Sequence, residues 1–137
     1  MDEKLKHLEF IQDVITRMNT NSFQLKGWAV TIVSAILALY ASTKNGQFVL
    51  MAAPAIVIFW LLDAYYLNQE RKYRGLYCDA AKKKSEVDIF SMDASGYKTG
   101  NYRYWNALWS QTIWTLYLGL LALVIAITLC LRLSGRA

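Results

Sequence analysis

Residues able to carry chemistry are scarce in this chain. His7 is the one histidine among 137 residues, and no Cys–His, Ser–His or HExxH pairing is present. A glycine-rich phosphate loop and a cluster with zinc-like spacing are also missing. We therefore expect no enzyme, no metal and no cofactor, and we expect His7 to be a solvated residue of a helix.

Charge is scarce as well. Charged residues make up 18% of the chain against 55% apolar residues, and the mean hydropathy of +0.21 is unusual for a soluble protein. The apolar excess lies in three uncharged runs: 27–42, 47–62 and 104–131. A membrane-spanning helix needs about 20 residues. These runs lack the polar face that a soluble three-helix bundle presents to water.

The runs predict an all-α membrane protein with three transmembrane helices. The expected segments are an amphipathic helix at 1–22, a transmembrane hairpin at 23–67 with spans at about 24–43 and 47–67, a helical segment at 68–107, a third span at 108–132 and an external tail at 133–137. The N-terminal helix rests on five apolar residues at spacings of three or four: Leu5, Leu8, Ile11, Ile15 and Met18. Asn19 to Ser22 interrupt this pattern, so Ser22 is expected to cap a separate helix that enters the membrane.

The second span carries Pro54, which is expected to kink it. Its helix is expected to continue past Leu67 to the lysines at 82–84, because 68–84 contains no proline and one glycine. We expect a new cap and a short helix at 85–88, followed by a loop at 92–101.

Lysine and arginine are distributed unevenly around the three spans. Twelve of the fifteen lie in the N-terminal segment and in 68–107, and three lie on the other side: Lys44, Arg132 and Arg136. The positive-inside rule therefore predicts a cytoplasmic N-terminus, a cytoplasmic 68–107 segment and an external C-terminus. Cys78 and Cys130 then lie too far apart in depth to form a disulfide.

Asp63 is an acidic residue near the cytoplasmic end of the second span. An ionised carboxylate at this depth is costly unless it is paired or hydrated. One interpretation is an ion pair with Lys26 or Arg71, and the other is a position at the mouth of a cation path. The two interpretations do not exclude each other.

Small and polar residues form a stripe at helical spacing on the first and third spans. The stripes are Gly27, Thr31, Ser34, Ala38 and Ala41, and Gln111, Thr115, Gly119, Ala122 and Ala126. Such stripes let helices approach closely in lipid, or they line a pore. The pore candidates are Thr31, Ser34, Asp63, Gln111 and Thr115. Either interpretation requires neighbouring helices, so we expect a homo-oligomer.

Basic and aromatic residues alternate in the 68–107 segment, whose eight cations and five acids leave a net charge of +3. The ligand-binding candidates are Arg71, Lys72, Tyr73, Arg74, Tyr77, Lys82, Lys83, Lys84, Lys98 and Arg103. Cations that follow phosphates and rings that stack on bases are what a single-stranded oligonucleotide requires. Basic residues beside a membrane also bind anionic lipid headgroups, so both interpretations stay open.

Two stretches, EFIQDVITRMNTNSFQLKGWAVTIVSAILALYA and FWLLDAYYLNQERKYRGLY, resemble a group of small bacterial inner-membrane proteins. A looser likeness continues through DIFSMDAS and YWNALWSQTIWTLYL. These proteins resemble membrane effectors of anti-phage systems, in particular the channel subunit of Hailong-type systems. The resemblance implies a tetrameric channel, which is held shut by short DNA oligomers made by a partner nucleotidyltransferase. In a bacterial inner membrane, the external C-terminus expected from the charge distribution is periplasmic.

We therefore expect a homo-oligomeric ion channel in the bacterial inner membrane, gated by a cytoplasmic ligand, that stops growth by depolarising the cell. The alternative is a non-conducting membrane adaptor. It would recruit a cytoplasmic partner through the 68–107 segment and the N-terminal helix.

The uneven charge distribution predicts the accessibility of Cys78. An impermeant thiol reagent should leave Cys78 unlabelled in intact cells and label it after lysis, because the residue is expected on the cytoplasmic side. An alkaline phosphatase fused to the C-terminus should be active. Labelling of Cys78 at the same rate before and after lysis would reverse the predicted orientation.

Overall fold

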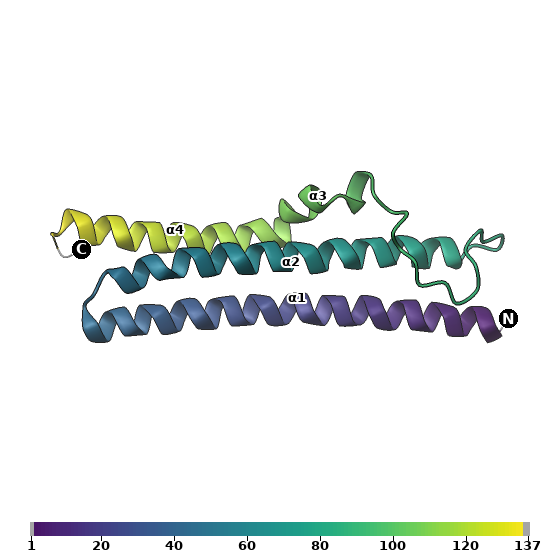
Figure 1. Ribbon diagram of the computed structural model, residues 1–137, viewed down its shortest axis with the longest axis horizontal. Helices are drawn as coiled ribbons and strands as arrows, with labels where there is room; N and C mark the ends of the chain where they lie inside the picture. The colour runs from purple at the N-terminus through teal and green to yellow at the C-terminus, as the bar shows by residue number, and fades with distance from the viewer. Residues whose placement is uncertain (1, 136–137) are drawn as a thin grey trace.

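The computed structural model describes residues 2–135, in which three long helices lie side by side with α2 in the middle (Figure 1). The elements are α1 (Asp2–Thr43), α2 (Gln47–Ala80), the 3₁₀ turn η1 (Gly100–Tyr102), α3 (Tyr104–Leu108) and α4 (Gln111–Leu133). Helices α1, α2 and α4 are each long and apolar enough to cross a membrane. The predicted helical class and the three candidate spans are therefore confirmed. Arg136, which entered the charge count, and Ala137 at the end of the predicted tail lie outside the described residues.

Helix α1 runs unbroken for 42 residues, or about 60 Å, which is twice the thickness of a bilayer core. The prediction that Asn19 to Ser22 separate two helices, with Ser22 as a cap, is therefore wrong. These residues differ from good helix formers by only about 0.5 kcal/mol each. Tertiary packing decides instead, because Ile15, Ser22 and Leu25 are all buried along one face of the helix.

Helix α2 begins at Gln47, directly after the turn at which the predicted hairpin reverses, and contains Pro54. It continues past Leu67 as predicted, but it ends at Ala80, before the lysines at 82–84.

The predicted short helix at 85–88 is absent from the described chain. The Ser85 hydroxyl accepts a hydrogen bond from the N–H of Val87 at 3.1 Å, a local turn that competes with a helix start. The predicted loop at 92–101 consists of turns and irregular chain, with η1 beginning at its end.

The third apolar run is divided. Helix α3 ends at Leu108, Trp109 and Ser110 leave helical geometry, and α4 starts at Gln111. The N-cap position of α4 is Ser110, whose backbone is extended with φ −63° and ψ 138°. The spanning part of this run therefore begins three residues later than the predicted boundary at 108.

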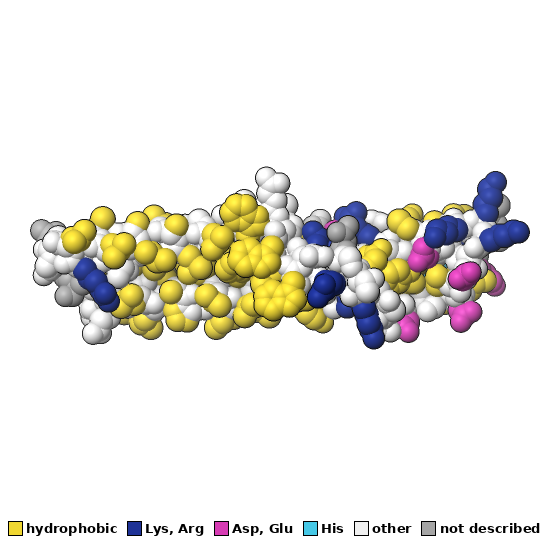
Figure 2. All heavy atoms as spheres, turned by 90° about the horizontal axis from the view of Figure 1, so that it is seen from above, with side chains coloured by type: hydrophobic (Ala, Val, Ile, Leu, Met, Phe, Trp, Pro, Cys, Tyr) yellow, Lys and Arg dark blue, Asp and Glu magenta, His cyan; other side chains and the backbone are white. Residues whose placement is uncertain are grey.

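Two regions of different polarity share the α1–α2 hairpin. Figure 2 shows hydrophobic side chains from one end of the molecule to its middle, where aromatic rings gather. Most of the charged groups on this face lie at the opposite end. We call residues 26–67 and α4 the apolar half, and residues 2–25 and 68–103 the charged half. The charged half has a core of its own, made of Ile11, Ile15, Leu76 and Ala80.

This second core predicts how the charged half responds to truncation. Ile11 is fully buried, whereas the neighbouring Phe10 is 41% exposed. Ile11→Ala should destabilise the charged half by about 2–5 kcal/mol by creating a cavity, and Phe10→Ala should cost much less. Limited proteolysis of the purified protein measures the difference. Equal cleavage rates for the two variants would contradict the packing of α1 on α2 in this half.

Candidate functional site

Three helices meet at the carboxylate of Asp63, which is fully buried. From α1, the Lys26 ammonium lies 2.6 Å from Oδ2, and the Ser22 hydroxyl donates a hydrogen bond to Oδ1. From α4, the Tyr117 hydroxyl donates to Oδ2 at 2.9 Å. Lys26 also donates to the Ser22 hydroxyl at 2.9 Å, which closes the network. We call these four residues the Asp63 network.

The local sequence explains why α1 supplies two partners. Ser22 and Lys26 are four residues apart in an unbroken helix, so they lie on one face and reach the same point on α2. The Lys26 side chain is 25% exposed, whereas that of Asp63 is fully buried. Lys26 therefore reaches the carboxylate from the edge of the network. Charge-assisted hydrogen bonds from several donors are the arrangement that a buried carboxylate needs.

The predicted ion pair is therefore formed with Lys26 and not with Arg71. Both carboxylate oxygens have partners. Within a single chain, Asp63 faces protein groups and not a water-filled path. Tyr117 was not among the predicted site residues. The sequence did offer a sign of its role. Tyr117 is the one tyrosine of α4, and it lies at a depth that matches Asp63 on α2.

Aromatic side chains next to the Asp63 network fix the junction between α3 and α4. The Trp60 ring stacks on Tyr117 with centroids 6.5 Å apart and planes at 6°, and its indole N–H donates to the carbonyl of Leu108 at 3.0 Å. Trp109 meets Trp60 edge-on at 5.6 Å. The Tyr104 hydroxyl donates to the carbonyl of Leu61 at 2.9 Å. These contacts hold the start of α4 against α2, which places Tyr117 beside the carboxylate.

The four other pore candidates lie away from Asp63. Thr31 and Ser34 on α1, and Gln111 and Thr115 on α4, are all exposed. The Thr31 hydroxyl donates to the carbonyl of Gly27 at 2.8 Å, and that of Thr115 to the carbonyl of Gln111 at 2.5 Å. A single chain therefore does not bring the five candidates together.

Both stripes of small residues face outward over their whole length. A Cβ atom added at Gly27 or Gly119 would meet nothing within 4 Å. Packing inside the chain uses other faces, with Ala29 of α1 and Val124 of α4 among the buried residues. The stripes therefore make no close helix contact within the described chain, and they remain open to lipid or to another copy.

The ten basic and aromatic candidates fall into separate places. Arg71 and Arg74 line a groove with Tyr102, and Lys82 and Lys84 line a second pocket with Glu86 and Val87. Tyr73 and Tyr77 pack against the core of the charged half, so their rings do not stand free for stacking. The remaining candidates lie outside both lined spaces: Lys72, which is half-buried, and Lys83, Lys98 and Arg103, which are exposed.

His7 is buried, with 3% of its surface exposed, so the prediction of a solvated histidine is wrong. It lies four residues before Ile11, on the face of α1 that packs inward. Its Nε2–H donates to the carbonyl of Ser91 at 2.7 Å, and its ring lies 6.0 Å from that of Phe90. His7 therefore fastens the loop after α2 to α1.

A second contact fastens the same loop to α2. The Tyr97 hydroxyl donates to Asp79 at 2.5 Å, while Lys82 donates to the other carboxylate oxygen of Asp79 at 2.8 Å. The bonds from Lys82 and Tyr97 lower the pKa of the Asp79 carboxyl. Burial and the bond to Asp79 raise the pKa of the Tyr97 phenol well above its usual range. Asp79 is thus a carboxylate with two partners.

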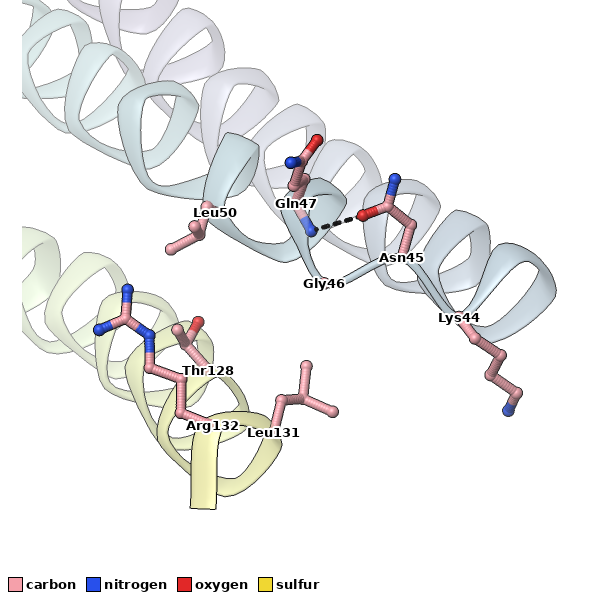
Figure 3. A pocket seen from close by; sticks show the side chains of 8 residues that line it. All are labelled: Lys44, Asn45, Gly46, Gln47, Leu50, Thr128, Leu131 and Arg132. Atoms are coloured by element: carbon pink, nitrogen blue, oxygen red, sulfur yellow. Dashed lines mark hydrogen bonds between the residues drawn. The ribbon is translucent and has the colours of Figure 1, made fainter. Parts of the chain in front are cut away.

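At the opposite end of the molecule, a pocket lies between the α1–α2 turn and the end of α4 (Figure 3). Arg132 and Thr128 come from α4, and the Asn45 side chain accepts a hydrogen bond from the N–H of Gln47 at 3.1 Å. The Lys44 side chain extends away from this space in Figure 3. The pocket contains none of the predicted site residues.

Comparisons with protein families, with curated proteins and with solved structures find no match for this chain. The resemblance to anti-phage effectors therefore stays a prediction. Two structural features bear on function: the Asp63 network and the two helices that pass through it.

The geometry of the Asp63 network predicts an asymmetry between two substitutions. Lys26→Met leaves a fully buried carboxylate without its cation and should cost about 3–5 kcal/mol. Asp63→Asn should cost less, because the partly exposed Lys26 can turn toward water. The double variant should be more stable than Lys26→Met alone. Thermal unfolding in detergent, followed by tryptophan fluorescence, measures all three, and additive losses would contradict the coupling.

Proposed function

We propose that this chain is the subunit of a homo-oligomeric ion channel in the bacterial inner membrane, gated by a cytoplasmic ligand, and that its opening arrests growth during phage infection. The observation that carries the proposal is the continuity of two helices. Helices α1 and α2 both extend without a break from the charged half through the Asp63 network into the apolar half. A displacement of the charged half would therefore reach the network directly.

The arrangement of the helices supports an oligomer. Three helices in a row, with α1 and α4 on either side of α2 (Figure 1), do not enclose a path across a membrane. Conduction requires several copies, and the outward stripes on α1 and α4 are faces at which small residues allow close contact with them. Thr31, Ser34, Gln111 and Thr115 would then supply the polar lining. A tetramer follows from the resemblance alone.

The Asp63 network is the proposed gate. Its bonds join α1, α2 and α4 at one point. A shift of α1 along α2 would separate Lys26 from Asp63 and free a carboxylate that favours cations. Interfaces of this kind switch between discrete packings, so a small displacement can open a path.

The distal lysines are the proposed site for the soluble ligand. Helix α2 extends 13 residues from Leu67 to Ala80, about 20 Å at 1.5 Å per residue. The headgroup layer on each side of a bilayer is only about 5–8 Å thick. With α2 close to the membrane normal, Lys82, Lys83 and Lys84 follow the end of α2 and lie beyond lipid headgroups. Their position favours a soluble anion such as a single-stranded oligonucleotide.

A non-conducting adaptor is the second candidate, and two observations favour it. Asp63 is fully buried, and both of its carboxylate oxygens have partners. A single chain therefore presents no free carboxylate at this level to attract cations. The charged half also exposes an apolar cluster. In this cluster the ring centroids of Phe10 and Phe90 lie 6.0 Å apart, and Ile89 is 57% exposed. A partner protein would cover such a surface.

Conduction distinguishes the two candidates. The purified protein should pass current in planar bilayers, and over-expression should depolarise cells containing a voltage-sensitive dye. Thr115→Val should reduce conductance by drying the path. Thr128→Val is the matched control, because Thr128 lies on the same helix outside the stripe and also bonds its own backbone.

Wild-type protein that reaches the membrane and leaves the potential intact, with or without phage, would favour the adaptor. Equal conductance in the parent and in both threonine variants would retain the channel and remove Thr115 from its lining.

A further inference from the structure

A groove runs along α2 just beyond its apolar half, with a volume of about 350 Å³. Arg71, Arg74 and Cys78 lie at helical spacing along it, and Tyr102 of η1 is among its lining residues. Gly75 forms its floor: a Cβ atom added there would lie 2.6 Å from the Tyr102 hydroxyl. The groove therefore keeps its shape because residue 75 has no side chain.

The charges in the groove favour an anion. Arg71 forms no ion pair with any residue from 2 to 135. Arg74 uses its Nε and one terminal nitrogen on a single oxygen of Glu70, at 2.8 and 2.7 Å, and its other N–H groups remain for a ligand. Asp79, the acid at the rim, is engaged by Lys82 and Tyr97. Two guanidinium groups one turn apart on a helix face lie close enough for both to bind one phosphate.

The depth of the groove identifies the source of that phosphate. Arg71 and Arg74 follow Leu67 by four and seven residues on the same helix, or about 6 and 10 Å. With a headgroup layer about 5–8 Å thick, Arg71 lies within the layer, and the long side chain of Arg74 can reach back into it. The Tyr102 hydroxyl lies 2.6 Å from the place of a Cβ atom on Gly75, so its ring reaches the same level of α2 as Arg74.

We propose that this groove binds the phosphate of an anionic lipid from the leaflet that faces the charged half. Arg71 and Arg74 contact the phosphate oxygens, and the Tyr102 hydroxyl donates from the opposite wall. A bound lipid would connect α2 to the segment that precedes α3. This site does not depend on conduction, so it applies equally to a channel and to an adaptor.

Neighbouring residues supply a matched test. Arg71 lines the groove, whereas Lys72 has the same charge at the same depth and lies outside it. The full-length protein in detergent is titrated with phosphatidylglycerol or phosphatidylcholine, and retained lipid is counted by native mass spectrometry. Arg71→Gln should lower the apparent affinity for phosphatidylglycerol about fivefold, and Lys72→Gln less than twofold. Equal losses, or no preference of the parent protein for phosphatidylglycerol, would overturn the site.

Gly75→Ala tests the shape of the groove independently of its charge, because it displaces Tyr102 and leaves both arginines in place. It should weaken phosphatidylglycerol binding as Arg71→Gln does. Binding equal to the parent would show that the charge of Arg71 acts without the groove. If Gly75→Ala does not give a monodisperse protein, the comparison of Arg71 with Lys72 decides alone. Displacement of the lipid by excess inorganic phosphate or by a short single-stranded oligonucleotide would assign the groove to a soluble ligand instead.

Discussion

A carboxylate within an apolar layer is the constraint on which the arrangement of this chain depends. Asp63 is fully buried and meets Lys26, Ser22 and Tyr117, which come from both of the other long helices. A buried charge is tolerated only with such partners, since the desolvation of an unpaired carboxylate would destabilise the fold. The register of α1 against α2 and the position of α4 all have to satisfy this one group.

The same register continues outside the apolar half. Ile11 and Ile15 pack on Leu76 and Ala80 in a small core, and His7 and Tyr97 tie the following loop to α1 and α2. The same two helices, α1 and α2, therefore form the charged half and the apolar half. This construction couples the two halves mechanically without a separate linker, because each helix belongs to both.

Features that depend on local spacing were predictable from the sequence. The run lengths predicted three candidate spans, and the depth of Asp63 limited its expected ion pair to Lys26 or Arg71. Features that depend on distant contacts were not. Asn19 to Ser22 read as a helix break, yet packing against α2 keeps them helical. Tyr117 and His7 look ordinary until the fold brings Asp63 and Ser91 beside them. The outward stripes are exposed along the described chain, so folding within one chain leaves them without a helix partner.

The order of residues along the chain also bears on biogenesis. The cation that neutralises Asp63 is on α1, which leaves the ribosome before α2, while α4 adds only the Tyr117 hydroxyl. The α1–α2 hairpin can therefore enter the translocon with its charges already matched. A lone carboxylate costs up to roughly 3 kcal/mol to insert, the value at the centre of a membrane helix, so synthesis of the cation first lowers the cost of placing this hairpin in a bilayer.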